Sequence, residues 1–136
     1  MLNIEVMKGM YEAWNDKMWN DAAGILIWMS HPAYPSFVWQ TYDYYFEPTA
    51  AYFAIKKASE PLHIQWNPAT DEVEVVNYSA GTHKGLTAKV QVLNMDASVA
   101  WEKEATVDSN EDTTDKCIKL EFPENLSKVH FIKMTL

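Results

Sequence analysis

The sequence predicts an α+β fold, in which a helix–strand–helix segment precedes an antiparallel β-sandwich. Two observations carry this prediction. Up to about residue 60, apolar residues recur at helical spacing or form one short continuous run, whereas beyond Pro61 they alternate with polar residues at a period of two. The 136 residues are enough to bury a core, and they allow one domain or two small ones.

A first helix is predicted from Asn3 to about Met18. Asn3 is placed to cap the helix, and Glu5 suits the positive end of the helix dipole. The spacing of three and four between apolar residues predicts an amphipathic helix. Its apolar stripe consists of Met7, Met10, Tyr11, Trp14 and Met18.

A buried strand and a second helix are predicted next. Residues 25–29 form a short continuous apolar run, which is typical of an interior parallel strand. Thr49 is placed to cap a helix over residues 50–59, and Pro61 ends it. Because one strand cannot form a sheet, we expect residues 1–60 to be a piece of something larger.

Six short strands are predicted in the remainder of the chain. Turn-rich segments separate the alternating runs, and this spacing favours a β-sandwich. The alternating positions are Val73 and Val75, then Leu86, Ala88, Val90 and Val92, then Val99 and Trp101, then Ile118, Leu120 and Phe122, with residues 63–66 before them and 129–136 after them.

Composition excludes several classes of protein. The net charge is −8 and every basic residue is lysine, so the chain repels polyanions and nucleic-acid binding is not expected. No apolar run approaches the roughly 20 residues that span a bilayer, and the first residues do not form a signal peptide. The single cysteine, Cys117, is expected to be a small strand hydrophobe.

The segment 28–48 is dense in aromatic residues with polar groups among them. Flat rings stack on the C–H faces of sugars, and neighbouring carboxylates or amides hold hydroxyl groups, so this composition suits the wall of a carbohydrate site. The alternative is that the rings form hydrophobic core or a domain interface. Composition alone leaves both interpretations open.

Motifs for other chemistries are missing from the sequence. It contains no glycine-rich nucleotide loop, no Gly-x-Ser-x-Gly elbow and no His-Glu-x-x-His pair. No metal site and no cofactor are expected, because the histidines lie at no ligand spacing and each is expected to serve locally. They are His31, His63, His83 and His130.

Two groups of carboxylates were candidates for chemistry. Asp43 and Glu47 are the only carboxylates in the aromatic segment, and we do not expect them to be a glycosidic acid/base pair. Asp43 is expected to orient its neighbours or to cap. Residues 108–112 resemble the opening of a calcium loop, but Thr113 stands where glycine belongs, so a solvated acidic turn is expected.

Several motifs carry a resemblance to a known family. In chain order they are Trp28-Met29 through Pro35-Ser36, then Val38-Trp39, Tyr42-Asp43-Tyr44-Tyr45, Glu47-Pro48, Tyr52-Phe53, Lys56-Lys57-Ala58 and Glu60-Pro61-Leu62-His63, with weaker similarity at 85–90 and 105–108. They resemble the C-terminal part of glycoside hydrolase family 2, in its exo-β-D-glucosaminidase and β-mannosidase branch.

The resemblance implies a division of the chain. Residues 1–61 would be the end of a (β/α)₈ TIM barrel, comprising its last helix, strand eight and final helix. Residues 62–136 would be the immunoglobulin-like β-sandwich that follows the barrel, truncated at its last strand. Active sites of such barrels lie at the C-terminal ends of the strands, so the aromatic segment would line the sugar pocket.

The resemblance also implies roles for individual residues. Trp28 would stack on the terminal sugar, and His31, Tyr34 and Trp39 would shape the rim. The two catalytic glutamates of the family precede the matched part, so no residue here is expected to be catalytic and the chain alone is expected to be inactive. His31 and Pro32 stand where the family usually has asparagines, which bears on the identity of the substrate.

Two functional classes follow. The first is a fragment of a retaining exo-glycosidase that acts on terminal β-glucosaminide or β-mannoside units. Its expected partners are carbohydrate and the remainder of the barrel. Binding to nucleic acid or to a membrane is not expected. The resemblance implies a periplasmic or secreted parent enzyme. The second is a non-catalytic carbohydrate-binding or self-associating β-sandwich module, held together through exposed barrel and sheet edges.

Overall fold

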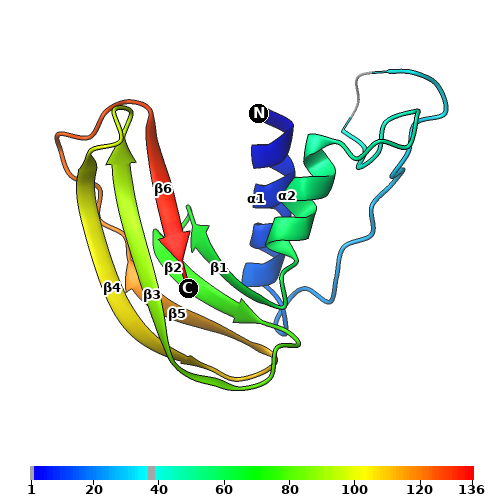
Figure 1. Ribbon diagram of the computed structural model, residues 1–136. Helices are drawn as coiled ribbons and strands as arrows, with labels where there is room; N and C mark the ends of the chain where they lie inside the picture. Colours follow the sequence, from blue (N-terminus) through cyan, green and yellow to red (C-terminus); the bar gives the residue numbers. More distant parts are fainter. Residues whose placement is uncertain (1, 37–38) are drawn as a thin grey trace. The chain divides into compact units, whose positions relative to one another are not determined.

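The computed structural model describes residues 2–36 and 39–136 (Figure 1). The chain divides into two compact units, Met1–Glu60 and Pro61–Leu136. Val38, which contributes to one of the matching motifs, lies outside the described residues. None of the helices in the described ranges has the length and apolar character needed to cross a membrane.

The first unit contains two packed helices, α1 (Leu2–Asp16) and α2 (Ala50–Ala58). Met7 of α1 is buried together with Ala51 and Ala54 of α2, and Ile4 and Ile55 pack against this cluster. The small alanine side chains allow the two helices to approach closely. The Asn15 side-chain amide donates a hydrogen bond of 2.8 Å to the carbonyl of Ala58, which ties the last turns of the helices together.

The boundaries and buried face of α1 differ from the prediction. The helix includes Leu2, so Asn3 lies inside its first turn and is not the cap. Within the predicted apolar stripe, Met7 is buried, whereas Met10 and Trp14 are exposed. The reason is that α2 is short and presents mainly alanines, so it covers only part of the stripe.

The second predicted helix is confirmed to within a residue, but its cap is not. Thr49 occupies the N-cap position of α2 without a side-chain cap hydrogen bond. Its hydroxyl instead donates to the carbonyls of Gln40 at 2.6 Å and Thr41 at 3.2 Å. A capping hydroxyl accepts a hydrogen bond from a backbone N–H of the first helical turn, whereas this hydroxyl shares its proton between two carbonyls of the preceding segment.

The predicted buried strand at residues 25–29 is wrong for this structure. The segment is irregular, and Leu26 is 100% exposed. A strand needs neighbours for its backbone N–H and C=O groups. Among the described residues of this unit, β-type pairing is limited to isolated bridges between Met18 and Ala22 and between Tyr42 and Pro48. The apolar run therefore has no sheet to enter.

The second unit consists of two antiparallel three-stranded sheets, and the predicted antiparallel strands are confirmed. One sheet has the order β1-β2-β5 and the other the order β4-β3-β6. Figure 1 shows the long strands β3 and β4 running side by side. The strands are β1 (Leu62–Asn67), β2 (Glu72–Asn77), β3 (His83–Asn94), β4 (Val99–Ser109), β5 (Thr113–Lys119) and β6 (His130–Thr135).

The core of this unit lies between the two sheets. Inward-facing residues of β2 and β5 pack against those of β3 and β4, which is the arrangement of a two-layer sandwich. The alternation of apolar and polar residues read from the sequence therefore identified the buried face. The buried cluster consists of Val73, Val75, Ala88, Val90, Val92, Val107, Ile118 and Leu120.

Two strand boundaries differ from the prediction. β4 continues to Ser109, because Ala105 and Val107 extend its alternation toward the core. β5 begins at Thr113, so the acidic turn is shorter than expected, and Leu120 and Phe122 follow the strand. Leu120 is nevertheless buried, and its N–H donates to the carbonyl of Asp71 at 2.7 Å.

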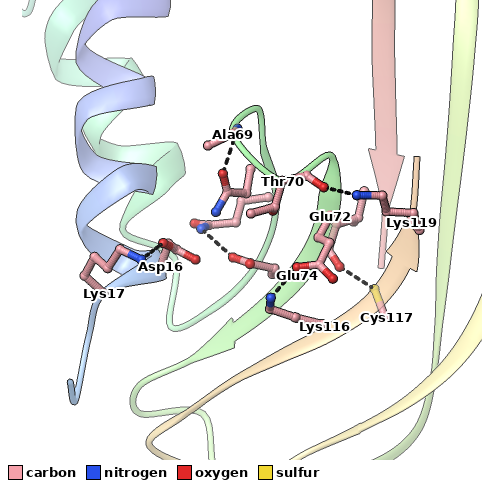
Figure 2. Close-up of polar contacts among 12 residues, drawn as sticks. Asp16, Lys17, Ala69, Thr70, Glu72, Glu74, Lys116, Cys117 and Lys119 are labelled. Atoms are coloured by element: carbon pink, nitrogen blue, oxygen red, sulfur yellow. Dashed lines mark hydrogen bonds and ion pairs between the residues drawn. The ribbon is translucent and has the colours of Figure 1, made fainter. Parts of the chain in front are cut away.

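Side-chain hydrogen bonds and an ion pair link β2, β5 and the turn that precedes β2. Figure 2 shows the Lys116 ammonium pairing with the Glu72 carboxylate, and Lys119 donating to the carbonyl of Thr70. The Cys117 thiol donates to the carbonyl of Val73 at 3.3 Å. Cys117 is thus a half-buried strand residue, as the sequence indicated.

Candidate functional site

The aromatic segment between the two helices lies on the surface of the first unit. Of its rings, Trp28 is 81% exposed, Tyr34 68% and Trp39 53%, and Tyr45 and Phe46 are more than two-thirds exposed. The alternative that these rings form the hydrophobic core is therefore wrong within this structure. Exposed rings at this density leave a ligand surface or an interface as the remaining interpretations.

A short turn at residues 43–47 organises one end of this segment. One carboxylate oxygen of Asp43 accepts hydrogen bonds from the backbone N–H groups of Tyr45 at 2.8 Å and Glu47 at 3.0 Å. The N–H of Asp43 in turn donates to the carbonyl of Glu47 at 3.0 Å, and Phe46 has a φ of 66°. The prediction that Asp43 orients its neighbours is confirmed.

Backbone contacts hold this turn beside the start of the segment. The carbonyl of Ser30 accepts from the N–H of Tyr42 at 2.9 Å and from the hydroxyl of Thr41 at 3.1 Å. The N–H of Thr49 donates to the carbonyl of Thr41 at 2.9 Å. Residues far apart in the segment are thereby fixed next to each other without regular secondary structure.

His31 is the centre of the ring contacts in the segment. Its imidazole stacks on Phe46 with ring centroids 4.2 Å apart and an interplanar angle of 11°, and it lies 6.4 Å from the ring of Tyr44. Its Nε2 is 3.2 Å from the carbonyl oxygen of Tyr44. The stack and the hydrogen bond together fix the ring plane, so the imidazole edge has a defined direction.

The four residues expected to bind a sugar do not form one ring cluster. His31 meets Phe46 and Tyr44, whereas no ring contact among the described residues involves Trp28, Tyr34 or Trp39. All four lie in the same irregular segment, between α1 and α2. Sequence reasoning missed Phe46 as the partner of His31, because the spacing of fifteen residues through an irregular loop carries no periodic signal.

A shallow pocket lies between the base of this segment and α2. It has a volume of about 440 Å³ and is lined by the rings of Tyr42 and Tyr52, whose centroids are 5.6 Å apart. Lys56 supplies an exposed ammonium group at its wall. Tyrosine hydroxyls and an ammonium group can donate hydrogen bonds to a sugar hydroxyl or to a carboxylate. The remaining lining residues are Thr41, Ile55 and Ser59.

The polar groups of the second unit serve local structure. Two of its histidines contact nearby backbone carbonyls: Nε2 of His83 is 2.9 Å from the carbonyl oxygen of Ala80, and Nδ1 of His130 is 3.2 Å from the carbonyl oxygen of Ser127. In the acidic turn, Asp108 accepts from the N–H of Gly85 at 2.8 Å. This bond, together with Lys84, lowers the pKa of the Asp108 carboxyl. Across the described residues, no group of three or more histidine, cysteine or acidic side chains could hold a metal ion.

Both the sequence and the fold are similar to those of glycosidases. No protein-family model matches the chain. Individual proteins do match, and they confirm the predicted resemblance to the exo-β-D-glucosaminidases and β-mannosidases of glycoside hydrolase family 2. The chain spans only 8–16% of the length of these relatives.

Two relatives illustrate the sequence match. The chain is 40% identical over 85 residues to an exo-β-D-glucosaminidase of Streptomyces avermitilis, which covers 62% of the chain and 9% of that enzyme. It is 28% identical over 140 residues to the exo-β-D-glucosaminidase of Hypocrea jecorina, covering 100% of the chain and 16% of the enzyme.

Solved structures extend the similarity to the fold. The exo-chitosanase of Amycolatopsis orientalis matches 97% of the chain with a TM-score of 0.88 at 25% identity, over 16% of that enzyme. A structure of this exo-chitosanase in complex with PNP-β-D-glucosamine matches with a TM-score of 0.89. A β-D-mannosidase of Dictyoglomus thermophilum shares the fold, with a TM-score of 0.75 at 19% identity over 96% of the chain.

Proposed function

We propose that this chain is part of a retaining exo-glycosidase of glycoside hydrolase family 2 that acts on terminal β-glucosaminide or β-mannoside units. The observation that carries the proposal is the match of 97% of the chain to an exo-chitosanase at a TM-score of 0.88. Most of the relatives are exo-β-D-glucosaminidases, and the others are a β-mannosidase and a mannosylglycoprotein endo-β-mannosidase, which supports β-glucosaminide or β-mannoside as the class of substrate.

In this proposal the two units have different tasks. The first unit is the end of a (β/α)₈ barrel, and its aromatic segment forms part of the sugar-pocket wall. The second unit is an immunoglobulin-like scaffold domain. The exposed apolar run at residues 25–29 supports this division, because a strand that has lost the neighbouring strands of its barrel has nothing to pair with.

Within the wall, Trp28 stacks on the terminal sugar while His31, Tyr34 and Trp39 shape the rim. Exposure of 81% makes Trp28 available for stacking, and indole is a large, rigid apolar surface. The carboxylates that protonate the leaving group and form the covalent intermediate belong to the rest of the enzyme in this proposal. The 136-residue chain is therefore expected to bind sugars without hydrolysing glycosides.

The test is a titration of the chain with glucosamine, mannose, chito-oligosaccharides and manno-oligosaccharides, followed by NMR chemical-shift mapping. The indole N–H signals of Trp28 and Trp39 report on the wall, and that of Trp101 in β4 is the internal control. Shifts confined to Trp28 and Trp39 support the proposal. Equal shifts at Trp101, or none at millimolar sugar, would contradict a preserved pocket wall.

A second candidate is a non-catalytic carbohydrate-binding or self-associating module. The observation that favours it is the exposure of the aromatic rings in the segment 28–48, among them Trp28 and Tyr45, which are 81% and 70% exposed. Sugar-induced shifts on the sandwich strands in the same titration would favour the carbohydrate-binding version of this alternative over the barrel fragment.

A further inference from the structure

Two groups from the same short turn contact the imidazole of His31. The carbonyl oxygen of Tyr44 lies 3.2 Å from Nε2, and the ring of Phe46 stacks on the imidazole with centroids 4.2 Å apart. Asp43 holds this turn, because its carboxylate accepts hydrogen bonds from two backbone N–H groups of the turn. All of these contacts are made within the segment 28–48. The orientation of the imidazole is therefore set locally.

The contact with Tyr44 also decides which ring nitrogen of His31 carries the proton. A carbonyl oxygen can only accept a hydrogen bond, so Nε2 is the donor. In a neutral imidazole one nitrogen donates and the other accepts, which makes Nδ1 the acceptor. Among the described residues none is hydrogen-bonded to Nδ1. His31 is only half-buried, so a ligand can reach the ring.

The stack and the hydrogen bond restrain the imidazole in different ways. The ring of Phe46 restrains the plane of the imidazole, since the two planes are inclined by only 11°. The hydrogen bond to Tyr44 resists a half-turn of the ring, because a half-turn would replace Nε2 by a carbon atom at the carbonyl. Together they keep Nδ1 on one edge of the ring, directed away from the Tyr44 carbonyl.

We propose that the turn at residues 43–47 presents Nδ1 of His31 as the hydrogen-bond acceptor for the amino group of a terminal β-glucosaminide. His31 then favours an amino sugar over a sugar that carries a hydroxyl at the same position. The inference rests on the proposed glycosidase function and deepens it, since it assigns a specificity-determining residue and selects one of two substrate classes. Tyr44 and Phe46 are positioning residues, because they act on the sugar only through His31.

The chemistry of the acceptor accounts for this preference. An ammonium group has three donors and no acceptor, whereas a hydroxyl can either donate or accept. A hydrogen bond from a charged donor is also roughly twice as strong as one between neutral groups. A neutral imidazole nitrogen with a free lone pair should therefore favour the amino sugar over its hydroxyl counterpart by roughly fivefold in affinity.

The first measurement is the state of the His31 ring in the free chain, from ¹H–¹⁵N NMR correlation of the neutral imidazole. We expect the Nε2–H tautomer and an observable Nε2–H proton, because the hydrogen bond to the carbonyl slows its exchange with water. Phe46→Leu should broaden this signal beyond detection, since the ring is no longer held in plane. Tyr45→Leu is the matched control, because the Tyr45 ring contacts Tyr44 in the same turn. A predominant Nδ1–H tautomer, or a signal that survives Phe46→Leu, overturns the proposal.

The second measurement compares methyl β-D-glucosaminide with methyl β-D-glucoside, which differ only in the amino or hydroxyl group at C2. The indole signals of Trp28 and Trp39 follow both titrations, and we expect roughly fivefold tighter binding of the glucosaminide. His31→Phe keeps a flat ring and the net charge of −8 but removes the acceptor, so this preference should fall while both glycosides still shift the indoles. Phe46→Leu should weaken the preference as well.

The outcomes separate this inference from the proposed function. Equal affinity for the two glycosides overturns the inference, although shifts of Trp28 and Trp39 would still support the glycosidase. A preference that persists in His31→Phe also overturns it, because general attraction of the ammonium to the negative chain then explains the preference. Absence of indole shifts with every glycoside overturns both proposals. Thermal unfolding of each variant checks that the fold is intact.

Discussion

His31 lies flat against Phe46, with ring centroids 4.2 Å apart and planes inclined by only 11°. The contact bridges two ends of a segment that contains no helix or strand in the described residues. It therefore contributes to holding the exposed aromatic surface in one arrangement, together with the hydrogen bonds to Ser30 and Asp43.

Removing the ring beneath His31 tests this contact. Phe46→Ala is expected to lower the stability of the segment by about 0.5–1 kcal/mol, since an aromatic pair contributes that much beyond area burial. The measurement is the NMR shift of the His31 ring protons, which lose the ring current of Phe46 and move downfield. Tyr34→Ala, an exposed ring in the same segment, is the control. An unchanged His31 spectrum in Phe46→Ala would contradict the stack.

The Asp43 turn gives a second test. Asp43→Ala removes the oxygen that accepts from the N–H groups of Tyr45 and Glu47, so both amides should exchange with solvent faster. The expected loss is roughly 1 kcal/mol of local stability. This is less than a buried hydrogen bond to a charged group would contribute, because the turn is exposed. Asp43→Asn retains an acceptor oxygen and should be milder. If both variants protect the two amides as the natural sequence does, the turn does not depend on Asp43.

Val90→Ala tests the sandwich core. Val90 is fully buried between the sheets, so deleting its methyl groups leaves a cavity and should lower the free energy of unfolding by roughly 2 kcal/mol. Urea unfolding followed by the Trp66 and Trp101 NMR signals is the measurement. Val99→Ala, at an exposed position of β4, should cost much less. Equal losses at the two positions would contradict the assigned core.

Asp108 predicts a pH dependence of stability. The N–H of Gly85 and the Lys84 ammonium lower its pKa below the usual value of 3.8. A carboxyl with a lowered folded pKa stabilises above its unfolded pKa, and this contribution is lost as the pH falls through the folded pKa. Asp108→Asn should therefore lower the melting temperature at pH 7, and the difference should shrink as the pH falls below 3.8 and vanish once the pH is below the folded pKa.

The matched control for that experiment is Glu121→Gln, which removes one negative charge from another exposed position of the same unit. A difference between Asp108→Asn and the natural sequence that stays constant from pH 7 to pH 2 would mean that the carboxylate charge is not involved.

Cys117 is expected to be a slow nucleophile. Burial raises the pKa of its thiol to about 11. At pH 8 only about one thiol in a thousand is then ionised, so alkylation by iodoacetamide should be roughly a hundredfold slower in the folded chain than in urea. The rate should rise with pH up to about the thiol pKa. Equal rates in folded and unfolded chain would contradict the half-buried position of Cys117, and Cys117→Ser is the control for labelling at other groups.

The period-two alternation was enough to locate the strands of the sandwich and its core. Val73, Val75, Val90 and Val92 face inward because a strand places alternate residues on opposite faces, and this rule is local. The strand ends were less accurate, as at β4, since Ala105 is a weak apolar signal. Pairing order within the two sheets is a long-range property that alternation does not encode.

The aromatic segment shows the limit of sequence reasoning. The density of rings and the role of Asp43 in a local turn could be predicted from the sequence, because both depend on neighbouring residues. The pairing of His31 with Phe46 was not, since it depends on how an irregular loop folds back. The apolar run at 25–29 was misread as a strand because local hydrophobicity cannot report whether neighbouring strands are present.

The sequence by itself determined the two kinds of local structure, the inward face of the sandwich strands, and the resemblance to glycosidases that the relatives confirm. Only the tertiary structure decided which rings are exposed, which aromatic ring stacks on His31, and how the strands pair within the two sheets. The physical reason is that periodicity and turn chemistry act between near neighbours in the chain, whereas burial, ring stacking and strand pairing depend on residues that folding brings together.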